Sequence, residues 1–81
     1  MSLEKLRTAR TVAGIHQVCK AVQSGTAETV FIAADVEDRV LGTLLAACRE
    51  RGITPDRTAT KAELGAQARL DVGAAAVATL R

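Results

Sequence analysis

Aromatic side chains are nearly missing from this chain of 81 residues, which contains one Phe and neither Trp nor Tyr. Sheet-type RNA-binding domains stack several bases on aromatic side chains. One Phe cannot build such a platform, so the sequence excludes this mode of base stacking. Sixteen of the hydrophobic residues are alanine, which predicts a thin and closely packed core.

Long hydrophobic runs are lacking as well. No apolar stretch reaches the roughly 20 residues that cross a membrane, and the N-terminal residues do not have the pattern of a signal peptide. A chain of this length fits a single small domain. We therefore expect residues 1–81 to form one soluble, cytoplasmic domain.

Cysteine and histidine are scarce, with two cysteines and one histidine in the chain. Cys19 and Cys48 fall at apolar positions of expected helices, where a free cysteine commonly acts as a small buried hydrophobe. One histidine and no CxxC pair cannot supply a closed zinc site. His16 has no accompanying nucleophile signature, and no glycine-rich phosphate loop occurs. The sequence thus predicts no metal, no cofactor and no enzyme active site.

What the chain does contain is an alternation of helical and extended patterns. Helices are predicted over residues 2–10, 14–24 and 37–51, and after the capping box TKAE at 60–63. Extended segments are predicted at 11–13, 29–34, 53–58 and 74–80. These alternating elements predict an α/β fold, a three-layer α/β/α sandwich around a small mixed sheet of about four strands.

The same patterns predict the burial and the ends of these elements. The apolar run TVFIAA suits a central strand buried on both faces, whereas Pro55 favours an edge position for its own strand. Gly25 and Gly52 are expected to end their helices. Glu37 and Asp38 lie in the first turn of an expected helix, where acidic residues compensate the helix dipole, so no catalytic role is needed to explain their presence. The third helix should bury one apolar face, formed by Val40, Leu41, Leu44, Leu45 and Cys48.

The segment GIHQVCKAV, residues 14–22, is a candidate binding surface. Its apolar positions leave His16, Gln17 and Lys20 pointing outward together, and Gln17 and Lys20 lie one turn apart. A helix N-terminus has free N–H groups that favour phosphate, and Gly14 leaves the backbone accessible. Formal net charge is +3 over residues 1–20, −2 over 21–53 and +1 over 54–81. On spacing alone, a solvated helix face is the preferred interpretation.

Three segments change that balance: GIHQVCKAVQSG, TVFIAADV and ELGAQARLDVGAAAVA, in this order over nearly the whole chain. They resemble the L-seven-Ae/L-thirty-e ribosomal protein family, and most closely its small bacterial members that bind kink-turn RNA. In this family the helix end lies against tandem sheared G·A pairs. The resemblance implies that Gln17 addresses a guanine edge and that Lys20 addresses a guanine or the backbone. Gly14 also matches the family motif, whereas His16 stands where archaeal and eukaryotic members often have Asn.

The resemblance implies a second contact in the loop before the last strand. Family members present an apolar–acidic–apolar triplet to an unstacked nucleotide, matched here by Leu70, Asp71 and Val72. Leu70 and Val72 could instead anchor the loop in the core, and for Val72 both interpretations stay open. Arg69 replaces a common family glycine and is a secondary candidate for a phosphate contact.

These observations predict a non-enzymatic protein that recognises kink-turn RNA, as a ribosomal protein or a ribosome-associated homologue. The alternative is a protein-interaction or structural member of the same fold without RNA affinity. No membrane partner is expected, and the free protein is expected to be a monomer. The candidate RNA-binding residues are Gly14, Ile15, His16, Gln17, Lys20, Arg69, Leu70, Asp71 and Val72.

Overall fold

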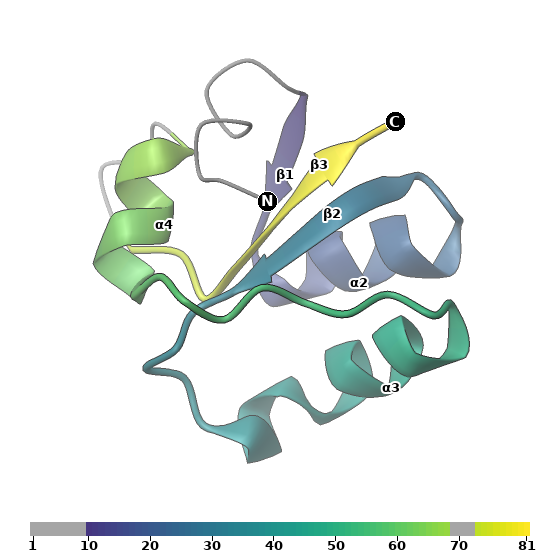
Figure 1. Cartoon of the computed structure of the whole chain (residues 1–81), viewed down its shortest axis with the longest axis horizontal. Coiled ribbons are helices and arrows are strands. Elements are labelled where there is room, and N and C mark those ends of the chain that lie inside the picture. Colours follow the sequence, from purple (N-terminus) through teal and green to yellow (C-terminus); the bar gives the residue numbers. More distant parts are fainter. Residues whose placement is uncertain (1–9, 69–72) are drawn as a thin grey trace.

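The computed structural model describes residues 10–68 and 73–81. Its elements, labelled as in Figure 1, are β1 (Thr11–Ala13), α2 (Ile15–Gln23), β2 (Ala27–Ile32), the 3₁₀ helix η1 (Asp38–Leu41), α3 (Gly42–Glu50), α4 (Lys61–Gln67) and β3 (Ala76–Leu80). Apart from Arg10, the helix predicted over residues 2–10 lies outside the described residues.

The sheet has three antiparallel strands among the described residues, in the order β1-β3-β2. The register pairs Ala78 with Val12 on one side and with Val30 on the other. β3 is therefore central among the three strands, and β2 lies between β3 and the segment around Asp56, so the interior position predicted for residues 29–34 is confirmed. That segment is also buried as expected, because β2 has both of its faces covered.

The predicted fourth strand at residues 53–58 is reduced to one parallel bridge between Phe31 and Asp56. The Ile32 N–H donates to the Asp56 carbonyl at 2.8 Å, and the Asp56 N–H donates to the Val30 carbonyl at 2.9 Å. Because the N–H and the carbonyl of Asp56 both face β2, the missing N–H of Pro55 lies on the outer side of the segment, as an edge position allows. With this single bridge, the expected count of about four strands is not confirmed, although the segment does lie at the edge of the sheet, as Pro55 indicated.

Two apolar clusters cover the two faces of the sheet, and they make the three predicted layers. Successive side chains of a strand point to opposite faces, so Val30 and Phe31 enter different clusters. One cluster packs α2 and α3 on the sheet through Val18, Val22, Leu44, Cys48, Ile32, Ala76 and Ala78. The other packs α4 on the opposite face through Leu64, Ala59, Ala33 and Val77. Figure 1 shows α2 and α3 together on one side of the strands and α4 apart from them.

The helix ends mostly follow the sequence signals. Gly25 has φ 78° after α2 and Gly52 has φ 68° after α3, so both glycines end their helices as predicted. Val40 departs from its predicted burial, because 55% of its surface is exposed. It lies in η1, where side chains repeat every three residues. This tighter winding turns Leu41 into the core and Val40 toward solvent.

The predicted capping box is present at the start of α4. The Glu63 N–H donates to Thr60 Oγ1 at 3.3 Å, and the Thr60 N–H donates to Glu63 Oε1 at 2.9 Å. Thr60→Ala is expected to lower the free energy of unfolding by about 1 kcal/mol, the usual cost of losing such a cap. Urea unfolding measures this loss. Thr54→Ala is the control, because Thr54 is exposed and lies outside the helices, and equal losses for the two variants would refute the capping contribution.

Among the described residues, no helix combines the length and the apolar character that crossing a bilayer requires.

Candidate nucleic-acid interface

α2 begins at a glycine whose backbone geometry sets the direction of the helix. Gly14 has φ 100° and ψ 145°, a conformation that side chains oppose. Its N–H donates to the Ala76 carbonyl at 2.9 Å, and its carbonyl accepts from the Val18 N–H at 2.9 Å. A Cβ placed on Gly14 would meet no atom within 4 Å. The glycine is therefore required for backbone conformation and not for space.

In the described part of the chain, no side chain caps the N-terminus of α2. The N–H groups of Ile15, His16 and Gln17 belong to the first turn, where a helix supplies no acceptor of its own. Gly14 provides no side-chain cap, and the first turn contains no acidic residue. Free N–H groups together with the positive end of the helix dipole favour an anion at this position.

The start of α4 presents the opposite case. Its capping box is closed by Thr60 and Glu63. In addition, the Lys61 N–H donates to Asp35 Oδ1 at 2.9 Å. Side-chain oxygens therefore already occupy N–H groups of the first turn of α4, whereas none of the described side chains caps the start of α2.

The predicted exposed face of α2 is confirmed. His16, Gln17 and Lys20 are exposed, whereas Val18, Cys19, Ala21 and Val22 are buried. Ile15 is half-buried against the cluster between the sheet and the helices α2 and α3. The three polar side chains make no hydrogen bond or ion pair with the rest of the described chain, so a ligand would not have to displace an internal partner.

The chain that leads into β3 is held beside the start of α2. The Ala33 N–H donates to the Ala75 carbonyl at 2.9 Å, and the Ala74 N–H donates to the Lys61 carbonyl at 3.0 Å. Gly14 is bonded to Ala76 in the same region. Residues 74–76 thus lie between the end of β2 and the starts of α2 and α4. The predicted contact residues that precede this segment lie outside the described residues, namely Arg69, Leu70, Asp71 and Val72.

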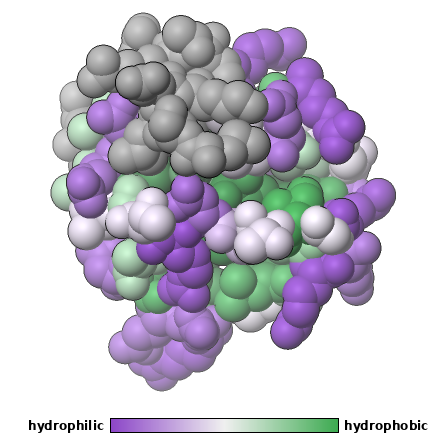
Figure 2. Space-filling model, viewed as in Figure 1, coloured by the Kyte–Doolittle hydropathy of each residue, from purple (hydrophilic) through white to green (hydrophobic). Residues whose placement is uncertain are grey.

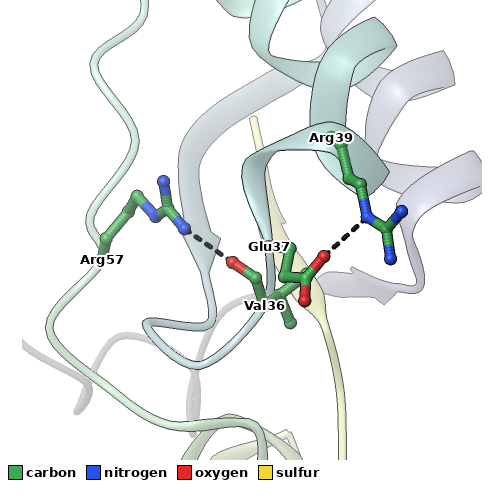
Figure 3. Close-up of polar contacts among 4 residues, drawn as sticks. All are labelled: Val36, Glu37, Arg39 and Arg57. Carbon is green, nitrogen blue, oxygen red and sulfur yellow. Dashed lines mark hydrogen bonds and ion pairs between the residues drawn. The ribbon is translucent and has the colours of Figure 1, made fainter.

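An acidic loop follows β2 at this end of the molecule, and arginines hold it (Figure 3). Arg57 Nη1 donates to Asp38 Oδ1 at 2.6 Å. Arg57 Nη2 donates to the Val36 carbonyl at 3.0 Å. Arg39 Nε donates to Glu37 Oε2 at 2.6 Å. These pairs face solvent, and exposed ion pairs contribute at most about 1 kcal/mol each. Their effect is to orient the loop and to neutralise its carboxylates.

The contacts that support the site join residues far apart in the chain. Asp35 and Lys61 are 26 residues apart, and Arg57 and Val36 are 21 apart. Local patterns therefore contain no signal for either contact. The segment that carries Arg57 is fixed by local contacts, because the hydroxyl and the N–H of Thr58 both donate to Asp56 Oδ1. These hydrogen bonds also lower the pKa of Asp56 below its ordinary value.

The two thiols lie in the core and not at the interface. Burial, with a smaller contribution from nearby Cys19, raises the pKa of the Cys48 thiol. The thiolate is the reactive form, so a buried thiol of raised pKa is a poor nucleophile. No group of three or more His, Cys, Asp or Glu side chains in the described residues is arranged to hold a metal ion.

Both cysteines are expected to react slowly with a thiol reagent in the folded protein, because both are buried. Urea should release two reactive thiols per chain, which a chromogenic disulfide reagent would count. Rapid stoichiometric labelling of either cysteine without urea would show that the packing of α2 against α3 described above is wrong.

Comparisons with known proteins identify relatives of this chain. A family model for the ribosomal protein L7Ae/L30e/S12e/Gadd45 family matches residues 2–81. An RNA-binding protein from Geobacillus sp. strain WCH70 is 33% identical over 82 residues, which cover 100% of both chains. The large ribosomal subunit protein eL8 of Haloquadratum walsbyi is 37% identical over 84 residues, which cover 98% of this chain and 70% of the relative.

A solved structure shows the same fold. The 15.5 kDa RNA-binding protein of Giardia lamblia matches with a TM-score of 0.85 and 25% sequence identity, over 98% of this chain and 70% of that one. Together the matches confirm the resemblance that the three sequence segments indicated.

Proposed function

Because this chain belongs to the ribosomal protein L7Ae/L30e/S12e/Gadd45 family, we propose that it is a non-enzymatic RNA-binding protein whose target is kink-turn RNA. The uncapped start of α2 is the observation that supports this proposal most strongly. It combines uncapped N–H groups with three exposed polar side chains that have no partner in the described chain. Relatives that align over nearly the whole chain are named as RNA-binding and ribosomal proteins.

Each polar residue of α2 has a distinct role in the proposed complex. The amide of Gln17 offers a donor and an acceptor, which suits the edge of a guanine in a sheared G·A pair. Lys20, one turn later, neutralises a phosphate or contacts a guanine. His16 offers fewer hydrogen-bonding groups than the Asn of many family members, so it makes fewer hydrogen bonds to a base. Gly14 and Ile15 let the RNA approach the backbone N–H groups.

The loop before β3 supplies the second contact of the proposal. Leu70 and Val72 cover an unstacked nucleotide with aliphatic surface, in a protein that has only one aromatic residue. Asp71 lies between them, and Arg69 reaches a phosphate. The position of Ala74 to Ala76 beside Gly14 supports this assignment, because it brings the chain that follows the loop to the start of α2.

The proposed mode of recognition is mainly by shape. A formal net charge of +2 is small for a protein that binds RNA through charge alone. Selection of a kinked geometry, with few base contacts, agrees with so modest a charge. We further propose that the protein acts in the cytoplasm as a monomeric single domain.

Lys20→Ala tests the electrostatic part of this site. If Lys20 neutralises one phosphate, the variant should bind a short kink-turn RNA more weakly, with a salt dependence reduced by about one unit in the log–log slope. Titrations across a series of salt concentrations measure both quantities. Arg39→Ala is the control, because Arg39 is an exposed cation that already pairs with Glu37. Unchanged affinity of Lys20→Ala at every salt concentration would remove Lys20 from the site.

A further inference from the structure

We propose that the end of the molecule opposite the start of α2 is a second RNA-binding surface, which binds the phosphate backbone of an RNA segment outside the kink-turn. We call it the arginine end, and it is formed by Arg10, Arg49, Arg51 and Arg81. This inference rests on the proposed RNA-binding function and adds a second place of contact to it.

The strand order brings the first part of this surface together. Since β3 is antiparallel to both neighbours, the starts of β1 and β2 and the end of β3 lie at one end of the sheet. The Leu80 N–H donates to the Arg10 carbonyl at 2.8 Å, and the Arg81 N–H donates to the Thr26 carbonyl at 2.9 Å. Residues from both ends of the described chain thus meet beside the turn between α2 and β2.

The end of α3 adds the other two arginines. The Arg51 guanidinium donates to the carbonyl of Gln23, the last residue of α2. This contact joins the last turns of the two helices and places Arg49 and Arg51 at the same end as Arg81. Figure 1 shows the end of β3, the turn between α2 and β2 and the end of α3 on the right of the view, with α4 on the left. Figure 2 shows hydrophilic residues along that right-hand side.

Among the described residues, the net charge is positive at the arginine end and not at the end that contains the start of α2. The arginine end contains its four arginines and two carboxylates, those of Glu28 and Glu50. The opposite end contains five carboxylates, those of Asp35, Glu37, Asp38, Asp56 and Glu63, against the four cations Lys20, Arg39, Arg57 and Lys61. A basic surface on one side is the usual electrostatic footprint of a nucleic-acid contact.

The arginine side chains are also available. At the opposite end, Arg39 and Arg57 are occupied by Glu37 and Asp38. Arg10, Arg49 and Arg81 are exposed and make no side-chain hydrogen bond or ion pair with the rest of the described chain. Arg51 is engaged with α2, so three guanidinium groups remain for a ligand.

Phosphate is the partner that fits these groups. A guanidinium group is planar and always charged, and it binds phosphate oxygens through two parallel hydrogen bonds. The surface has no apolar anchor for a protein partner, since Val40 is the one large exposed hydrophobic residue described and it lies near the start of α3. The molecule measures 29 × 27 × 19 Å, and RNA bound at the start of α2 lies at the end opposite the arginine end. A separate RNA segment is therefore the proposed occupant.

The test uses two variants that each remove two exposed cations and lower the net charge equally. Arg49→Gln with Arg81→Gln alters the arginine end, and Arg39→Gln with Lys61→Gln is the control at the opposite end. Each protein is first saturated with a short kink-turn RNA, and a labelled plain RNA duplex is then added. We expect the wild-type protein and the control to bind the duplex as a ternary complex. The arginine-end variant should bind it more weakly, with a salt slope lower by about two units.

The first step of the same experiment reports on the proposed function separately, because the wild-type protein and the arginine-end variant should bind the short kink-turn RNA alike. If none of them binds it, the proposed function fails, and the duplex is titrated into the free proteins to test the arginine end alone. Failure of the wild-type protein to bind the duplex would overturn the inference. Equal weakening by the two variants would overturn it as well, since binding would then follow net charge and not position.

Discussion

Gln17→Ala is expected to weaken binding of kink-turn RNA by about 1–3 kcal/mol, the usual contribution of a good two-hydrogen-bond contact to a base. The side chain of Gln17 is exposed and does not enter the core, so the variant should melt at the wild-type temperature. Its loss of affinity should be nearly independent of salt, because an uncharged amide releases no counterion. A titration with labelled RNA at two salt concentrations measures both properties.

Gln23→Ala is the matched control for this experiment. Gln23 is the same residue type, exposed, on the same helix, but it lies at the far end of α2. It should leave affinity for the short kink-turn RNA unchanged. If the Gln23 variant lost as much affinity as the Gln17 variant, the start of α2 would not be the binding surface.

Gly14→Ala is expected to destabilise the fold by about 1–3 kcal/mol, because an alanine must adopt the strained backbone region that Gly14 occupies. The cost is conformational, since a Cβ at this position meets no neighbouring atom. The same change should also weaken RNA binding, because relief of the strain would turn the first N–H groups of α2 away from the RNA. Urea unfolding and RNA titration of one preparation separate these two effects.

Gly42→Ala provides the contrast. Gly42 has helical angles, φ −48° and ψ −51°, and a Cβ there also meets nothing within 4 Å. Alanine at such a position commonly stabilises a protein by about 0.4–1 kcal/mol, because it restricts the unfolded chain. Opposite signs for the two substitutions are therefore expected. Equal stability of the Gly14 variant and the wild-type protein would contradict the backbone conformation at the start of α2.

The parts of the fold that depend on neighbouring residues could be predicted from the sequence. The capping box at Thr60 and the glycines after α2 and α3 involve contacts within a few residues, and all appear as expected. The central position of β3 could not be predicted, because pairing of Ala78 with both Val12 and Val30 depends on residues far apart in the chain. Val40 was misplaced for a local reason, since the apolar pattern assumed an α-helical turn where the chain forms η1.

In the candidate site too, local features could be predicted from the sequence and long-range contacts could not. Helical periodicity predicted the exposure of His16, Gln17 and Lys20. The hydrogen bonds between Asp35 and Lys61 and between Arg57 and Val36 join segments that are distant in the chain, so no local pattern predicted them. Roles in RNA binding came from the resemblance and not from spacing, because a solvated helix face produces the same spacing. The gathering of Arg10, Arg49 and Arg81 likewise depends on topology, which composition along the chain does not reveal.

The most direct measurement of the central claim follows the bend of the RNA. A protein that binds only the kinked form must shift the bending equilibrium by its differential affinity for that form. A kink-turn RNA with a dye at each end, in low salt without magnesium, should fold when the protein is added, with a rise in energy transfer. An RNA whose G·A pairs are replaced by Watson–Crick pairs should neither bend nor bind tightly. Equal binding to the two RNAs, without a rise in energy transfer, would contradict the proposed function and leave only nonspecific attraction to phosphate.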